Sequence, residues 1–257
     1  MSAGRDHDLT RREALAALAA SGPLLLAGAA AAALPAPPPG KEDALNSKAA
    51  LVGKHTVVPL PFAAGSLHGL SERLITSHHD NNYAGAVRNL NGVEQELARI
   101  TPATPPFLVA ALRERELAFR NSKTLHEAYF ANLGGDGRRS GAIESALAQA
   151  YGTSARWQEQ MRATGMGLGG GSGWAILAFE LDTGALRTVS SGGHTQALAN
   201  SVPLLVLDMY EHSYQMDFGA GVTPYLDAFF ANVDWNEVNR RLERARHMHT
   251  LVGANAG

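Results

Sequence analysis

The chain has 257 residues, a formal net charge of -2, 45% apolar residues, and ten histidines but no cysteine. The apolar fraction suffices for a globular core, and the near-neutral charge argues against a nucleic-acid partner. Without cysteine there can be no disulfides, zinc–thiolate sites or iron–sulfur clusters. Any metal must therefore be held by nitrogen and oxygen ligands.

Residues 1–36 have the pattern of an export signal. Arg11 and Arg12 precede an alanine-rich, weakly apolar run over residues 14–33. Paired arginines before a modest apolar stretch are typical of a twin-arginine signal peptide. We therefore expect export through the twin-arginine machinery to the periplasm or a similar exported location, with no permanent membrane span. The alternative is an uncleaved N-terminal membrane anchor. Residues 37–56, which follow, are expected to be a linker.

Two long helices are predicted next, in an N-terminal domain over residues 57–137. Ser71 is a candidate N-cap for the first helix, whose apolar residues recur at helical spacing as far as Ile100. The second helix is expected over residues 107–133, where a pair of glycines ends it. Because a short proline-rich segment joins the two, they are expected to form an antiparallel hairpin.

A C-terminal α/β domain is predicted over residues 138–253. Residues 141–166 indicate two short helices, and a helical C-terminus closes the domain. Three short apolar runs indicate the strands of a small antiparallel sheet: residues 174–179, 186–189 and 204–207. The expected fold is therefore α+β. The glycine-rich run before the first strand lacks the Lys-Ser/Thr of a phosphate-binding loop, which argues against nucleotide binding there.

Four side chains are candidate metal ligands. Asp208 directly follows an apolar strand and His212 comes four residues later, so both could reach one ion. His126 lies in the middle of the second helix. His78 is in phase with the apolar residues of the first helix, whereas His79 is expected to face solvent. Each of these residues taken singly is more often structural than a ligand. Three histidines and one carboxylate together would suit iron or manganese.

Five motifs, in order along the chain, are similar to those of the iron/manganese superoxide dismutases. The similarity covers about residues 60–242, which is nearly all of the expected mature chain. The motifs are Leu60-Pro61-Phe62 followed by His78 and Asn89-Leu90-Asn91; Leu125-His126 through Tyr129-Phe130; Gly171-Ser172-Gly173-Trp174-Ala175; Leu207-Asp208 through His212-Ser213-Tyr214; and Tyr225-Leu226 with Asn232-Val233-Asp234-Trp235.

The resemblance implies a superoxide dismutase that converts superoxide to dioxygen and hydrogen peroxide. It implies one iron or manganese ion per subunit, held by His78, His126, Asp208 and His212 together with a solvent molecule. The alternative is a non-dismutase metal-binding or peroxide-reactive protein on the same fold. The resemblance places a histidine, His194, near the metal, and this favours iron, or the use of either metal, over manganese alone.

The surroundings of the ligands depart from the family pattern. Many members place a glutamine beside the solvent, either from the second helix, where this chain has Ser122, or from the loop after the second strand, where it has His194. Ser122 is too short to reach, so His194 is the expected outer-sphere residue. The family's gate tyrosine aligns with Ala86 and its companion histidine with Asn82. Alanine at position 86 leaves a space that water or Tyr83, one turn earlier, could fill. The expected catalytic residues are therefore His194, Tyr83 and Asn82.

The resemblance also assigns residues around the metal and at a subunit interface. Tyr129, Trp174 and Tyr210 are expected near the ligands. Glu211 matches the glutamate that bridges to the partner subunit's ligand histidine, so a homodimer is expected. Gln215 replaces a tyrosine of the subunit interface. It is expected to form an amide pair there with Asn82, which replaces the companion histidine.

Overall fold

The computed structural model describes residues 53–254, which belong to one compact unit spanning residues 48–257. The predicted signal over residues 1–36 and most of the predicted linker lie outside the described residues. The described end of the linker is attached to the first long helix: His55 N donates to Asn91 Oδ1 at 2.8 Å. Among the described residues, no helix is long and apolar enough to cross a membrane.

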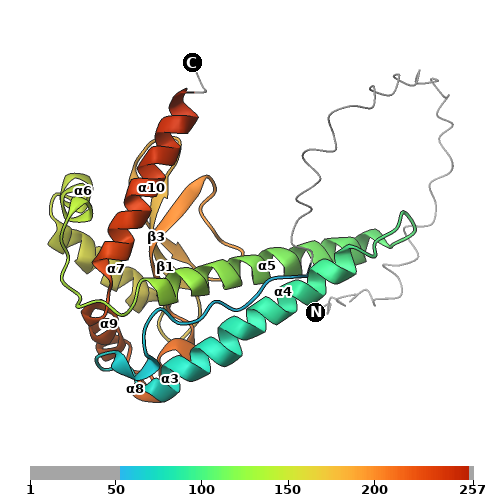
Figure 1. The fold of residues 1–257 in the computed structure, drawn as a ribbon, viewed down its shortest axis with the longest axis horizontal. Coiled ribbons are helices and arrows are strands. Elements are labelled where there is room, and N and C mark those ends of the chain that lie inside the picture. The colour runs from blue at the N-terminus through green and yellow to red at the C-terminus, as the bar shows by residue number, and fades with distance from the viewer. Residues whose placement is uncertain (1–52, 255–257) are drawn as a thin grey trace, which may run out of the picture. The chain divides into compact units, whose positions relative to one another are not determined.

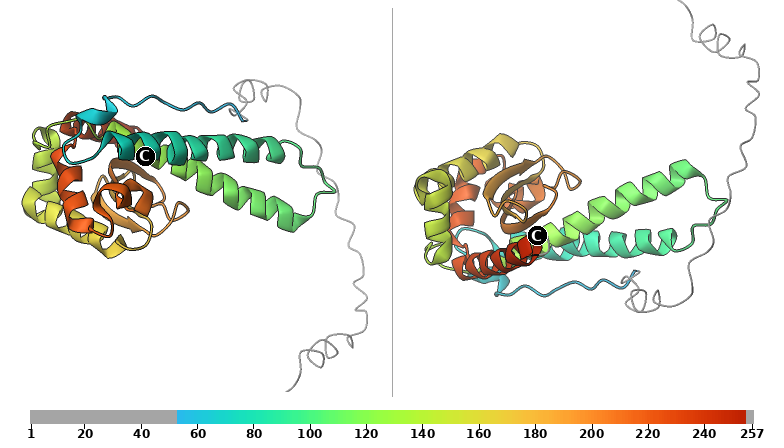
Figure 2. Two further views of the ribbon diagram at one scale, coloured as in Figure 1. Left: turned by 90° about the horizontal axis from the view of Figure 1, so that it is seen from below. Right: turned by 90° about the horizontal axis from the view of Figure 1, so that it is seen from above.

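The predicted helical hairpin is present. Ser71 caps α3 (Glu72–Ser77) by accepting a hydrogen bond from Leu74 N at 3.0 Å, which confirms the predicted N-cap. A π-helical turn (His78–Tyr83) and α4 (Ala84–Leu97) complete the first arm. The second arm, α5 (Pro106–Ala131), runs antiparallel beside α4 (Figure 1). Figure 2 shows the two arms together in both further views.

The π-helical turn overturns two sequence expectations. The first arm is not one uninterrupted α-helix, and His79 is buried, with 9% of its surface exposed. A π-helical turn holds more residues than an α-helical one, so the neighbours His78 and His79 both face inward. His79 Nε2 donates to the carbonyl of Val58 at 2.9 Å. The prediction that His79 faces solvent is therefore wrong.

The C-terminal part contains the predicted sheet and helices, which confirms the α+β fold. β1 lies in the middle of the sheet, antiparallel to β2 on one side and to β3 on the other. The strands are β1 (Trp174–Glu180), β2 (Leu186–Ser191) and β3 (Ser201–Asp208). The helices are α6 (Ala142–Tyr151), α7 (Ser154–Leu168), α8 (Gln215–Phe218), α9 (Val222–Ala231) and α10 (Trp235–Ala254). Short 3₁₀ turns lie at Ala64–Ser66 and Glu211–Ser213.

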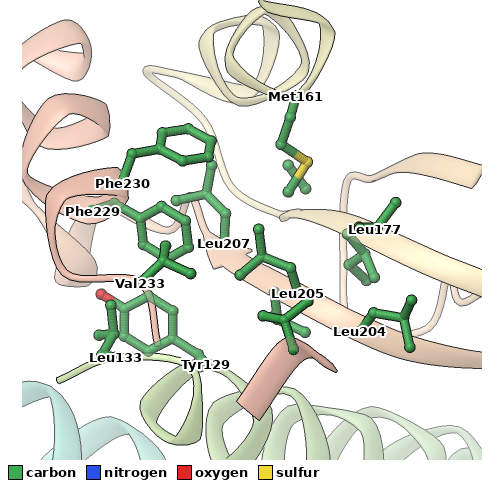
Figure 3. Close-up of a cluster of buried hydrophobic side chains, with 14 of the residues drawn as sticks. Tyr129, Leu133, Met161, Leu177, Leu204, Leu205, Leu207, Phe229, Phe230 and Val233 are labelled. Carbon is green, nitrogen blue, oxygen red and sulfur yellow. The ribbon is translucent and has the colours of Figure 1, made fainter. Parts of the chain in front are cut away.

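The main core lies on both faces of this sheet. Figure 3 shows Met161 of α7 on one side of the strands and Tyr129 of α5 on the other, with Leu205 and Leu207 of β3 among the side chains between them. Helices on both faces explain why the first six residues of β1 are all buried and do not alternate between apolar and polar.

The strand register brings three chain segments to one end of the sheet. Trp174, the first residue of β1, pairs with Ser191 at the end of β2 and with Asp208 at the end of β3. The segment after β2 carries His194, and the segment after β3 carries His212. Two candidate ligands and the expected outer-sphere residue therefore meet at this end of the sheet.

Candidate metal centre

Four predicted ligands converge on one point. Asp208 Oδ2 lies 3.1 Å from His78 Nε2, 3.4 Å from His212 Nε2 and 3.6 Å from His126 Nε2. One ligand atom from each of the four residues lies within 4.8 Å of all the others. Residues far apart in sequence, such as His78 and Asp208 with 130 positions between them, thus form one compact N₃O donor set.

Each ligand comes from a different structural element. His78 begins the π-helical turn, His126 lies on α5, Asp208 ends β3 and His212 lies in the 3₁₀ turn that follows. The first three side chains are buried, whereas 26% of the His212 side chain is exposed. Of the four ligands, His212 is therefore the one nearest the surface.

Asp208 is held as an anion. The backbone N–H of Tyr210 donates to Oδ1 at 2.9 Å, which leaves Oδ2 facing the histidines. Burial alone would raise the pKa of this carboxyl group, but the adjacent imidazoles of His212 and His78 lower the pKa well below its usual value.

Two of the histidines, His126 and His78, are held as neutral ligands. His126 Nδ1 donates to the carbonyl of Ser122 at 2.7 Å, so the lone pair of its neutral form is on Nε2 and faces the cluster. Burial lowers the pKa of His126 to about 3 and also lowers that of His78. Neutral imidazole is the form that binds metal.

Several buried nitrogens support a cation at this point. Nε2 of His126 and Nε2 of His212 are buried and have no hydrogen-bond partner among the described residues. Buried polar atoms without partners are uncommon in folded proteins, and a cation between the four side chains would satisfy both. Three imidazoles and one carboxylate also suit iron or manganese. The residues present therefore fit such an ion.

Comparison with known proteins decides the family. Residues 139–241 match the family model described as iron/manganese superoxide dismutases, C-terminal domain. The chain is 44% identical to a protein named superoxide dismutase [Fe] from Cupriavidus metallidurans, over 73% of this chain and 95% of that one. This chain belongs to the iron/manganese superoxide dismutase family. The predicted resemblance is thereby confirmed.

Relatives named for either metal match this family member. The chain is 31% identical to superoxide dismutase [Mn] 1 of Halobacterium salinarum, over 76% of this chain and 98% of that one. It is also 32% identical to superoxide dismutase [Fe] of Aquifex pyrophilus, over 70% of this chain and 87% of that one. Membership thus implies one iron or manganese ion without selecting between them.

Three predicted aromatic residues surround the ligands of this superoxide dismutase family member. The centroids of the Trp174 and His126 rings lie 5.0 Å apart, edge to face. Tyr210 stacks on His212 at 5.4 Å, and Tyr129 lies 5.1 Å from the ring of His78. Burial raises the pKa of Tyr129, so its phenol stays neutral. These rings pack against three of the four ligands.

His194 lies beside the same cluster. Its ring stacks on Tyr210 at 4.7 Å, and its Nδ1 accepts a hydrogen bond from Trp174 Nε1 at 3.0 Å. Its ring centroid is 6.5 Å from that of His126. Burial lowers the pKa of His194, which favours the neutral imidazole.

The structure places the remaining predicted residues at different distances from the ligands. Tyr83 is buried, with its ring 6.2 Å from that of His126. Its hydroxyl donates to Glu127 Oε1 at 2.7 Å and accepts from Val58 N at 2.9 Å. Asn82 is half-buried and its side chain makes no hydrogen bond within the described part of the chain. The Tyr83 hydroxyl is thus engaged by two neighbours.

Glu211 and Gln215, the predicted interface residues, are both exposed in the single chain.

Sequence reasoning missed the contribution of Ser122, which it treated only as a lost glutamine. The backbone carbonyl of Ser122 fixes the tautomer of His126. The spacing of four residues on one helix could have indicated this contact, because residues i and i+4 share a face.

Proposed function

We propose that this protein disproportionates superoxide to dioxygen and hydrogen peroxide at one iron or manganese ion held by His78, His126, Asp208 and His212. The observation that carries the proposal is the convergence of three imidazole nitrogens on one carboxylate oxygen at 3.1 to 3.6 Å. Relatives named superoxide dismutase, matched over most of their length, support it.

When bound, the ion supplies one-electron redox chemistry. The chain's own residues set the charge around it: one carboxylate is the sole anion among the four ligands, so an ion of charge +2 or +3 would keep net positive charge, which attracts an anionic substrate. Access is on the side of the partly exposed His212. We assign His194, Tyr83 and Asn82 to the hydrogen-bonded surroundings that supply the protons consumed in the second half-reaction. The histidine at position 194 favours iron or the use of either metal.

The second candidate is a metal-binding or peroxide-reactive protein without dismutase activity. Ala86 favours it, because the family's gate tyrosine is missing at this position. Retention of all four ligands in one cluster favours the dismutase.

Metal loading tests the choice. The metal-free protein is loaded separately with iron, manganese and zinc, and superoxide decay is followed by stopped flow. We expect activity with iron, with manganese or with both, and none with zinc, which fits the same ligands but has no redox chemistry. Stoichiometric iron and manganese binding without dismutation in either form would favour the second candidate.

We also propose export through the twin-arginine machinery to the periplasm. Arg11 and Arg12 before a weakly apolar run support this proposal. The double substitution Arg11→Lys, Arg12→Lys is expected to leave the full-length chain in the cytoplasm, whereas the native chain is recovered shortened in the periplasmic fraction. The changes are charge-conserving, so equal fractionation of the two chains would count against this route.

A homodimer is the proposed assembly. The exposed Glu211 directly precedes His212, the most exposed of the four ligands. A second subunit seated there would bury Glu211 and Gln215 and narrow the access to both centres.

A further inference from the structure

The segment that carries His194 has little support of its own. Residues 192–200, which follow β2, are mostly exposed, and Gly192 and Gly193 immediately precede His194. Several of its hydrogen bonds are local: Ser191 Oγ donates to Gly193 O at 2.7 Å, and Gly192 N donates to Gln196 Oε1 at 2.7 Å. Such a segment does not by itself fix the position of an imidazole.

Three side chains from outside the segment contact His194: Tyr210 stacks on its ring at 4.7 Å, and two others form hydrogen bonds with it. Trp174 Nε1 donates to His194 Nδ1 at 3.0 Å, and Asn121 Nδ2, from α5, donates to the carbonyl of His194 at 2.6 Å. An indole N–H can only donate, so Nδ1 must be the acceptor. In the neutral imidazole the proton is then on Nε2, and this N–H is the donor that His194 has left to offer.

A cavity makes the Asn121 contact more important. A space of about 200 Å³ separates α5 from the sheet next to this segment. Its walls are mainly apolar and include Ile176, Val189 and Leu198, and Asn121 and Thr124 line it from α5. Side chains therefore do not fill the space between the segment and α5, and the hydrogen bond from Asn121 joins these two parts of the chain beside it.

We propose that Asn121 is a positioning residue, which holds His194 in place through its backbone carbonyl so that Nε2–H serves as a hydrogen-bond donor at the metal centre. Trp174 selects the tautomer and Asn121 sets the position. The inference rests on the proposed function, because it names the residue that places the outer-sphere donor of that site. Asn121 touches no ligand and acts only through His194.

The test uses Asn121→Asp, which keeps the size of the side chain and removes the donor. The aspartate oxygen would face the carbonyl oxygen of His194, so the segment is expected to move away. Thr124→Ala is the matched control, because Thr124 lines the same cavity and its side chain makes no hydrogen bond to the described residues of the segment. Both variants and the native protein are loaded with the same metal, and metal content, redox titration and dismutation rate are compared.

We expect unchanged metal content and a dismutation rate lowered about tenfold in Asn121→Asp, at the low end of losses seen for outer-shell residues. We also expect the ratio of oxidised to reduced metal at a fixed potential to change about tenfold. This corresponds to a shift of about 59 mV in the reduction potential of a one-electron couple. Thr124→Ala is expected to leave both values unchanged. A native rate and potential in Asn121→Asp, or equal changes in the control, would overturn the proposal.

Two further measurements separate the possible failures. If Asn121→Asp does not fold or load metal, Asn121→Ala removes the donor without adding charge and is judged by the same readouts. Long-range nitrogen NMR on the metal-free native protein reads the His194 tautomer directly, and protonation at Nδ1 would contradict the assignment. If the native loaded protein shows no dismutation, the proposed function fails, while the redox titration still decides the role of Asn121.

Discussion

Replacing Asp208 with asparagine is expected to abolish dismutation and to lower the affinity for iron or manganese by at least about a hundredfold. Even outer-shell residues change metal affinity by about 10- to 100-fold, and Asp208 is a proposed direct ligand and the sole anion of the four. An amide keeps the shape of the side chain but removes the charge that balances the cation. Metal content after desalting and superoxide decay are the measurements.

Asp234→Asn is the matched control for this change. Asp234 Oδ1 accepts from Asn236 N at 3.0 Å at the start of α10, and asparagine caps a helix as well as aspartate does. This variant should retain native metal content and activity. Because the Asp208 side chain is fully buried, circular dichroism must first show that Asp208→Asn is folded. A folded Asp208→Asn that keeps its metal and its rate would refute the assignment of the ligands.

Removal of the metal is expected to lower the melting temperature by about 10 °C. A ligand present at a thousand times its dissociation constant stabilises the folded state by about 4 kcal/mol. For a chain of this size each kcal/mol shifts the melting temperature by about 2–4 °C. The structure adds a local reason, because without a cation the Nε2 atoms of His126 and His212 are buried without partners. Calorimetry before and after chelation measures the shift.

Refilling separates loss of metal from damage by the chelator. Iron or manganese added back should restore the original melting temperature. Asp208→Asn, which we expect to bind little metal, should melt at nearly the same temperature with and without chelator. Equal melting temperatures for loaded and stripped native protein would mean that the four residues do not hold a stabilising ion.

Most secondary-structure elements near the site could be predicted from local sequence patterns. The N-cap at Ser71, the two arms of the hairpin and the three strands all depend on residues a few positions apart. β3 begins at Ser201, three residues before the predicted apolar run, because pairing with β1 continues as far as Glu180. The short helices after Asp208 were not predicted, since a helix of three or four residues has no periodicity to detect.

The sequence failed where a local irregularity changed the geometry. His78 and His79 were assigned to opposite environments because an α-helix turns neighbouring residues about 100° apart. The π-helical turn over His78–Tyr83 changes that relation, and the segment at Val58 then covers His79. Nothing in helical periodicity marks where such a turn occurs.

The sequence by itself determined the family, the α+β class and the identity of the four candidate ligands, because these are written in ordered motifs and in local periodicity. Only the tertiary structure decided how those residues are held. The carbonyl of Ser122 sets the tautomer of His126, the His212 side chain stays partly exposed, and Asn121 reaches His194 across 73 residues of sequence. The physical reason is that hydrogen bonds and burial depend on which segments pack together, and packing is settled only when the whole chain folds.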